Sequence, residues 1–101
     1  MVKHIELNPE WVLSKLPQSL YADGNGGVSL DTDSATDASW IKLALITLLI
    51  PYEENEYGDG EMTFIDIEFR IDDLKQDCPN LYKRMKEMDA KNNIYKHTNL
   101  N

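Results

Sequence analysis

Residues 61–71 alternate between apolar and polar side chains, and this alternation constrains the fold more than any other feature of the chain. One set of side chains is Thr63, Ile65, Ile67, Phe69 and Ile71, and the other is Met62, Phe64, Asp66, Glu68 and Arg70. Successive side chains of a strand point to opposite faces of its sheet. The pattern therefore predicts a half-buried strand, with the first set in the core.

Asn8, Pro9 and Glu10 mark the start of a short helix over residues 9–16. Asn8 can accept hydrogen bonds from the free amides of the first turn, Pro9 suits the first helical position, and Glu10 favours the positive end of the helix dipole. Pro17 should end or bend this helix. The apolar residues that precede this helix predict a short edge strand, which contains Val2, Ile5 and Leu7.

A second helix is predicted over residues 35–50, where Ser34 and Asp37 fit a capping box and Pro51 provides the stop. Apolar side chains cover nearly all of its circumference, and Lys42 is its single basic residue. Helices that are apolar all round are buried. We therefore expect this helix either to be buried on both sides or to lie in a subunit interface.

Loops are predicted where turn-forming residues gather. Residues 22–27 contain three glycines with an aspartate and an asparagine, which predicts a turn or mobile loop, followed by a strand fragment at residues 28–30. Residues 53–60 are acidic and contain glycine, so we expect a second loop there.

The C-terminal part of the chain should be mostly helical. Residues 72–73 indicate a helical turn or loop, and residues 78–79 start a helix. Its apolar positions recur at helical spacing, at Leu81, Tyr82, Met85, Met88 and Tyr95. The asparagines at 92–93 should weaken its last turns, and residues 96–101 should form a frayed tail.

These elements predict one α+β domain over residues 1–101, with about three helices packed on a small, mostly antiparallel sheet. A chain of 101 residues has the length of a single domain. Such a chain can build a core without disulfides or a structural metal. It has no room for a cofactor-binding domain beside a substrate domain.

The composition disfavours several classes of partner and compartment. The net charge is −8, so neither nucleic acid nor an anionic membrane is expected to bind directly. The longest apolar run, residues 43–50, is far shorter than the ~20 residues of a membrane-spanning helix. The N-terminus lacks the apolar core of a signal peptide, and the single cysteine, Cys78, cannot form an internal disulfide. A cytoplasmic location is therefore expected.

No motif for a metal, a cofactor or covalent catalysis has the required pattern. Residues 23–34 resemble the start of a calcium loop but lack its glycine and its bidentate glutamate, so we expect a plain turn. His4, His97 and Cys78 do not have metal-ligand spacing. We expect no metal, no cofactor and no enzymatic activity. The sequence does not exclude a pair of catalytic carboxylates, because two such residues can be distant in the sequence and come together only in the folded chain.

The tryptophans and most methionines are expected to serve the core. Trp11 and Trp40 each lie near a helix start, and their alternative role is that of a binding anchor. Met62, Met85 and Met88 should fill space between larger side chains.

The charges are unevenly distributed along the chain. Residues 53–77, here called the acidic segment, carry ten acidic side chains against Arg70 and Lys75, so their net charge equals that of the whole protein, −8. Residues 78–101 carry five basic and two acidic side chains. The candidate binding residues of the acidic segment are Glu53, Glu54, Glu56, Asp59, Glu61, Asp66, Glu68, Asp72, Asp73 and Asp77.

Asp66 and Glu68 share one face of the predicted strand, about 6.6 Å apart at ~3.3 Å per residue. Phosphates along a DNA strand are spaced on a comparable scale, and each carries one charge. Extended by the other carboxylates of the acidic segment, such a row would attract the basic groove of a nucleic-acid enzyme. We expect a small non-enzymatic inhibitor that mimics DNA and binds a protein with a basic surface, such as a nuclease or a restriction factor.

In size and charge the chain resembles the small acidic inhibitors of bacteriophages and bacterial conflict systems, which include anti-restriction, anti-CRISPR and immunity proteins. That resemblance implies action in the host cytoplasm if a phage encodes the protein. Acidity also serves solubility, which is the competing explanation of the acidic segment.

The alternative function is that of a structural or assembly subunit. The apolar central helix would then form the subunit contact. The basic C-terminal helix would meet the acidic segment of another copy through Lys83, Arg84, Lys86 and Lys91. A homodimer is compatible with both functions.

Overall fold

A computed structural model describes the backbone of residues 8–98 and the side chains of residues 8–93. Within that part, three α-helices and a four-stranded antiparallel sheet form a small α+β domain, which confirms the predicted fold class. The elements in chain order are α1 (Pro9–Lys15), β1 (Ser19–Ala22), β2 (Gly27–Thr32), α2 (Ala35–Thr47), β3 (Glu53–Gly58), β4 (Thr63–Arg70), the 3₁₀ helix η1 (Ile71–Leu74) and α3 (Pro79–Thr98).

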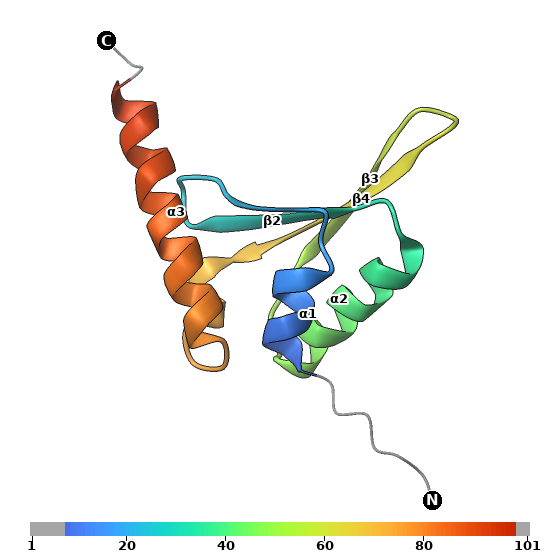
Figure 1. Cartoon of the computed structure of the whole chain (residues 1–101), viewed down its shortest axis with the longest axis horizontal. Helices are drawn as coiled ribbons and strands as arrows, with labels where there is room; N and C mark the ends of the chain where they lie inside the picture. The colour runs from blue at the N-terminus through green and yellow to red at the C-terminus, as the bar shows by residue number, and fades with distance from the viewer. Residues whose placement is uncertain (1–7, 99–101) are drawn as a thin grey trace, which may run out of the picture.

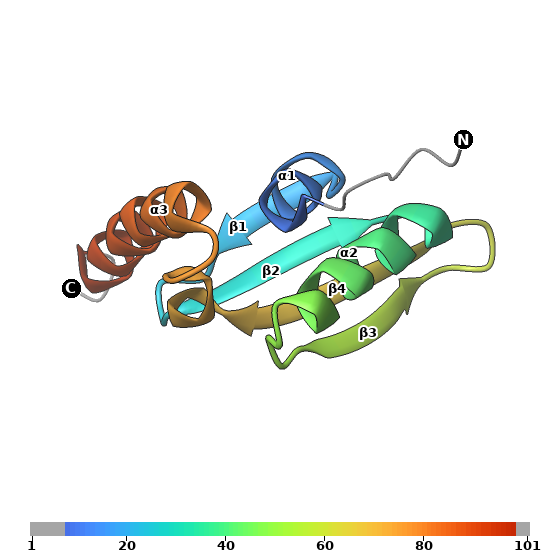
Figure 2. The ribbon, with the colours of Figure 1, turned by 90° about the horizontal axis from the view of Figure 1, so that it is seen from below.

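The sheet is covered on one face only. Its strands lie in the order β1-β2-β4-β3, and each neighbouring pair is antiparallel. Helices α1 and α2 lie against one face, and α3 lies across one end of the sheet beside β1 (Figure 1, Figure 2). Among the described elements, no helix covers the opposite face, which we call the open face.

The core fills the space between the sheet and the helices. Strands β2 and β4 contribute Val28, Leu30, Ile67 and Phe69, all buried, and this confirms the predicted alternation over the second half of β4. Thr63, which the same pattern placed in the core, is exposed at the start of the strand. The helices and η1 supply the remaining large buried side chains, among them Leu13, Ile41, Leu45, Ile71, Leu74, Leu81 and Met85.

The two predicted N-caps are present. The Trp11 amide donates to Asn8 Oδ1 at 3.1 Å, and the Asp37 amide donates to Ser34 Oγ at 3.1 Å. The second half of the predicted capping box differs, since the Ser34 amide donates to Thr32 Oγ1 at 3.1 Å.

Helix α2 ends at Thr47, three residues before the predicted end, so the prediction that Pro51 stops the helix is wrong. The Leu49 amide donates to the Ile46 carbonyl at 3.0 Å, and the Ile50 amide donates to the Leu45 carbonyl at 2.9 Å. Leu49 has φ 59°, the left-handed conformation that glycine usually supplies at this position. Because residue 49 is not a glycine, this helix end could not be predicted from the usual sequence signal.

The prediction of a loop over residues 53–60 is also wrong, because Glu53–Gly58 forms β3 and pairs with β4. Every residue of β3 is exposed, so the strand lacks the apolar alternation by which a strand is recognised. Charged side chains are common on edge strands, where they oppose pairing with other chains. Strand β1 was likewise missed, and the fragment at 28–30 is the middle of β2.

The β1–β2 turn is a plain turn, as predicted, and α3 docks on it through polar groups. The Asn93 side-chain amide donates to the Gly24 carbonyl at 2.8 Å, and that of Asn92 donates to the Ala22 carbonyl. Asp89 Oδ1 accepts the Gly26 amide at 3.1 Å. The two asparagines thus anchor the helix rather than weaken it.

Two predicted features fall at the chain ends. The edge strand expected at Val2, Ile5 and Leu7 lies outside the described residues, as do residues 99–101 of the expected frayed tail, which stays a prediction. Within residues 8–98, no helix is both long enough and apolar enough to cross a membrane.

Candidate functional site

The open face carries carboxylates from three strands. The register places Asp31 of β2 opposite Asp66 of β4, and Glu53 of β3 opposite Glu68 of β4. Neighbouring strands are ~4.8 Å apart, and residues two positions apart on a strand are ~6.6 Å apart. These four residues therefore occupy two adjacent cross-strand rows, and we call them the acidic patch.

Two hydroxyl groups fix the aspartates of the acidic patch. Ser29 Oγ donates to Asp66 Oδ1 at 2.5 Å, and the Tyr57 hydroxyl donates to Asp31 Oδ2. The hydrogen bond to Asp31 is the main cause that raises the pKa of Tyr57 to about 12. Asp31 Oδ1 is buried and has no hydrogen-bond partner among the described groups. The patch is thus ordered by neutral donors that leave its negative charge in place.

The pKa of Glu68 is raised in the folded protein. Partial burial raises the pKa of its carboxyl group, and the charges of Asp66, Glu53 and Asp23 raise it further. A cation that approached the patch would relieve this repulsion.

A shallow hollow of about 700 Å³ adjoins the patch. The side chains that define its open-face wall include Tyr21, Asp23, Ser29, Glu53, Glu68 and Arg70. Further along the face, the rings of Tyr57 and Phe64 stack with centroids 5.5 Å apart. Carboxylates beside aromatic rings suit guanidinium and ammonium groups, which pair with the former and lie over the latter.

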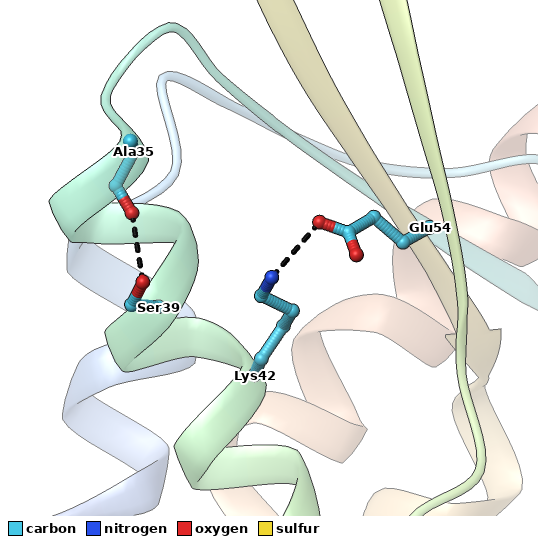
Figure 3. Close-up of polar contacts among 4 residues, drawn as sticks. All are labelled: Ala35, Ser39, Lys42 and Glu54. Carbon is cyan, nitrogen blue, oxygen red and sulfur yellow. Dashed lines mark hydrogen bonds and ion pairs between the residues drawn. The ribbon is translucent and has the colours of Figure 1, made fainter.

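The structure separates two acids of β3 from the patch. Glu54 and Glu56 alternate with Glu53 and so lie on the opposite side of the strand. Lys42 of α2 donates to Glu54 Oε1 at 3.0 Å, one turn below the Ser39–Ala35 hydrogen bond of the same helix (Figure 3). This ion pair ties β3 to α2.

The remaining acids of the acidic segment lie at its two ends. Asp59 and Glu61 are in the β3–β4 turn, where the amides of Glu61 and Met62 donate to Asp59 and lower the pKa of its carboxyl group. Asp72 and Asp73 lie in η1 and Asp77 follows it, and Asp72 pairs with Lys86 at 3.3 Å. The ten acids therefore do not form one row; only Glu53, Asp66 and Glu68 come together.

Asp31 belongs to the patch, and Ser29 and Tyr57 donate hydrogen bonds to its aspartates, but none of the three was predicted as a site residue. The sequence predicts only a short strand fragment where β2 lies and a loop where β3 lies. The face of the sheet on which these side chains lie therefore could not be predicted. The alternation of Val28, Leu30 and Thr32 with polar residues along β2 was the signal that could have found Asp31.

The groups considered for other chemistry have structural roles or face solvent. Cys78 is buried, and burial, followed by the charges of Glu10 and Asp77, raises its pKa to about 11. Its thiol therefore stays protonated at neutral pH. Among the described side chains, no three His, Cys, Asp or Glu residues are arranged to hold a metal ion.

The expectation that both tryptophans pack on the core is wrong, since Trp11 is 54% exposed and Trp40 is 41% exposed. Met62, expected in the core, is 51% exposed next to the β3–β4 turn, whereas Met85 is buried and Met88 packs against the core.

Comparison with protein-family models, with curated proteins and with solved structures finds no match for this chain.

Proposed function

We propose that the protein is a small non-enzymatic inhibitor that binds a basic, nucleic-acid-binding surface of another protein through its acidic patch. The observation that carries the proposal is the register of β2, β3 and β4, which gathers Asp31, Glu53, Asp66 and Glu68 on a face that no helix of the described chain covers. The site of action is the cytoplasm, that of the host if a phage encodes the protein.

The electrostatics of the patch favour a cationic partner. Like charges directly opposite each other destabilise a sheet, yet two such pairs stand side by side here. Arginine or lysine side chains of a partner would neutralise them, and the negative field would speed association.

The shape of the molecule favours a groove over a flat surface. The β3–β4 hairpin projects past the helices, and it carries Asp59 and Glu61 at its turn (Figure 1). A groove that accepts DNA has the width and the basic lining to receive such a hairpin together with the open face. A nuclease or a restriction factor is the partner class that this combination fits.

A capture experiment tests the proposal. The tagged protein is incubated with bacterial lysate at low salt and then washed at ~0.5 M salt, where the Debye length falls to a few ångströms. We expect a nucleic-acid-binding enzyme that is released by salt and also by added duplex DNA. The proposal would be contradicted if no such enzyme is captured, or if the captured enzyme is released neither by salt nor by DNA.

Charge reversal locates the binding surface. The double variant Asp66→Lys with Glu68→Lys should lose about 100-fold or more in affinity for the captured enzyme, because loss of one partner of an interfacial charge pair costs about 2–5 kcal/mol. The matched control is Asp73→Lys with Asp77→Lys, which changes the net charge equally at two exposed residues in and after η1, outside both the patch and the hairpin. Equal losses in both variants would attribute the acidity to net charge alone, and thermal unfolding confirms that both variants are folded.

A further inference from the structure

The outward side of α2 is apolar and exposed. Trp40, Leu43 and Ile46 recur every three residues and are 41%, 46% and 57% exposed, and Leu49, just after the helix, is 89% exposed. The buried side of the same helix is made by Ala38, Ile41, Ala44 and Leu45. We call the four exposed residues the α2 stripe.

The α2 stripe is larger than the scattered apolar exposure of ordinary surfaces. From the exposed fractions of its four residues, each copy presents on the order of 450 Å² of surface, which is the size of the largest apolar patch on a typical monomer, and such patches often have a function. The sheet and α1 bury one side of α2, while Trp40, Leu43, Ile46 and Leu49 stay exposed on the other side within the described chain.

We propose that two copies of the chain pair through the α2 stripe about a two-fold axis near Leu43, and that the resulting homodimer turns its two acidic patches away from each other. This inference does not depend on the inhibitor function, because it uses the opposite side of the molecule.

A second copy fits the charges of this surface. Helix α2 carries one acid, Asp37, and one base, Lys42, so it has no net charge, and Lys42 is already paired with Glu54. A contact between the open faces would instead oppose two acidic patches. Pairing through α2 leaves the two sheets roughly 30 Å apart, if each of the three layer contacts spans ~10 Å. That separation is nearly four times the ~8 Å Debye length at physiological salt, so repulsion between the two patches is screened.

The stripe is also self-complementary. Leu43 lies midway between Trp40 and Ile46, so an antiparallel contact centred on Leu43 places Trp40 against Ile46 of the partner subunit, and the reverse. The two stripes together bury about 900 Å² of surface, and the neighbouring polar atoms of Thr36, Ser39 and Thr47 bring the total towards the ~1,200 Å² of the smallest stable interfaces. A dimer in the micromolar range is the expected outcome.

Sedimentation velocity across a concentration series tests the proposal. We expect reversible dimerisation below about 100 µM, and a rise of at least tenfold in the dissociation constant for Ile46→Arg and for Leu43→Arg. Met62→Arg is the matched control, since Met62 is 51% exposed but lies outside the α2 stripe, in the β3–β4 turn. The proposal is overturned if the wild-type protein stays monomeric at 100 µM. It is also overturned if neither α2 substitution changes the dissociation constant of the dimer.

A cysteine at the axis tests the geometry. Leu43→Cys should form an intermolecular disulfide rapidly in mild oxidant, since residues at a two-fold axis meet their own copies, while the native Cys78 is buried and does not compete. Thr36→Cys, two turns away on the same side of α2, should cross-link much more slowly. Equal rates would exclude the proposed axis. The dimer should persist in the Asp66→Lys, Glu68→Lys variant. Failure of the dimer proposal can therefore be distinguished from failure of the proposed inhibitor function.

Discussion

Glu68 has like charges both across the sheet and along its own strand. It lies opposite Glu53 on β3, and Asp66 lies two residues before it. Its pKa is raised above the ordinary 4.5, chiefly by burial and then by these neighbours, so the folded protein holds this proton to a higher pH than the unfolded chain does. The protonated carboxyl group therefore favours folding below pH 4.5, and this contribution is lost as the pH rises through the raised pKa.

Glu68→Gln should accordingly stabilise the protein at pH 7. The side chain is exposed, so the gain in the free energy of unfolding should be only about 0.2–0.5 kcal/mol. The gain should disappear at pH 4, where Glu68 itself is largely protonated. Urea unfolding at the two pH values measures it, with Glu56→Gln as the control outside the patch. A gain of the same size at both pH values would show that repulsion on the open face is not its cause.

At this scale, the alternation of residues 61–71 was enough to place Asp66 and Glu68 on one exposed face. The facing of Asp31 and Tyr57 depends on β2 and β3, and the hydrogen bonds Tyr57–Asp31 and Ser29–Asp66 join residues 26 and 37 positions apart. Contacts between residues so distant in the sequence cannot be read from local patterns, so these two hydrogen bonds were not predictable.

At the scale of elements, α2 ends in hydrogen bonds that normally require glycine. Leu49 holds φ 59°, although a side chain in the left-handed region costs roughly 1–2 kcal/mol. Ile50 is buried and its amide bonds the Leu45 carbonyl, so the packing of Ile50 compensates for that strain.

Leu49→Gly should relieve the strain and raise the free energy of unfolding by about 1 kcal/mol, after the greater flexibility of glycine in the unfolded chain is subtracted. Because Leu49 also belongs to the α2 stripe, thermal unfolding is compared in the Ile46→Arg background, where we expect a monomer. Leu48→Gly is the control, since Leu48 has φ −84°, and it should destabilise the protein. Destabilisation by both changes would mean that Leu49 stabilises the fold through contacts that outweigh its backbone conformation.

Helices were predicted well where capping side chains and apolar periodicity coincide, as for α1 and the start of α2. The sequence could not indicate β3, because an edge strand exposed on both sides has no buried face to create a pattern. It was also uninformative about Asn92 and Asn93, whose bonds to the β1–β2 turn depend on where α3 lies in the fold.

At the scale of the whole molecule, the surfaces on the two sides of the sheet differ in charge and polarity. The open face concentrates negative charge, and the outer side of α2 is apolar and neutral. In the sequence, the acidic segment and the apolar central helix predict competing functions. Helix α2 lies on one side of the sheet (Figure 1), and the acidic patch lies on the open face, so a single molecule can use both surfaces.

Competition with DNA tests the central claim most directly. The enzyme recovered by capture is purified, and its binding to the fluorescently labelled protein is titrated at increasing concentrations of duplex DNA. If the acidic patch occupies the nucleic-acid site, the apparent dissociation constant rises in proportion to the DNA concentration and no ternary complex forms. An unchanged dissociation constant, with protein and DNA bound to the enzyme together, would contradict the claim.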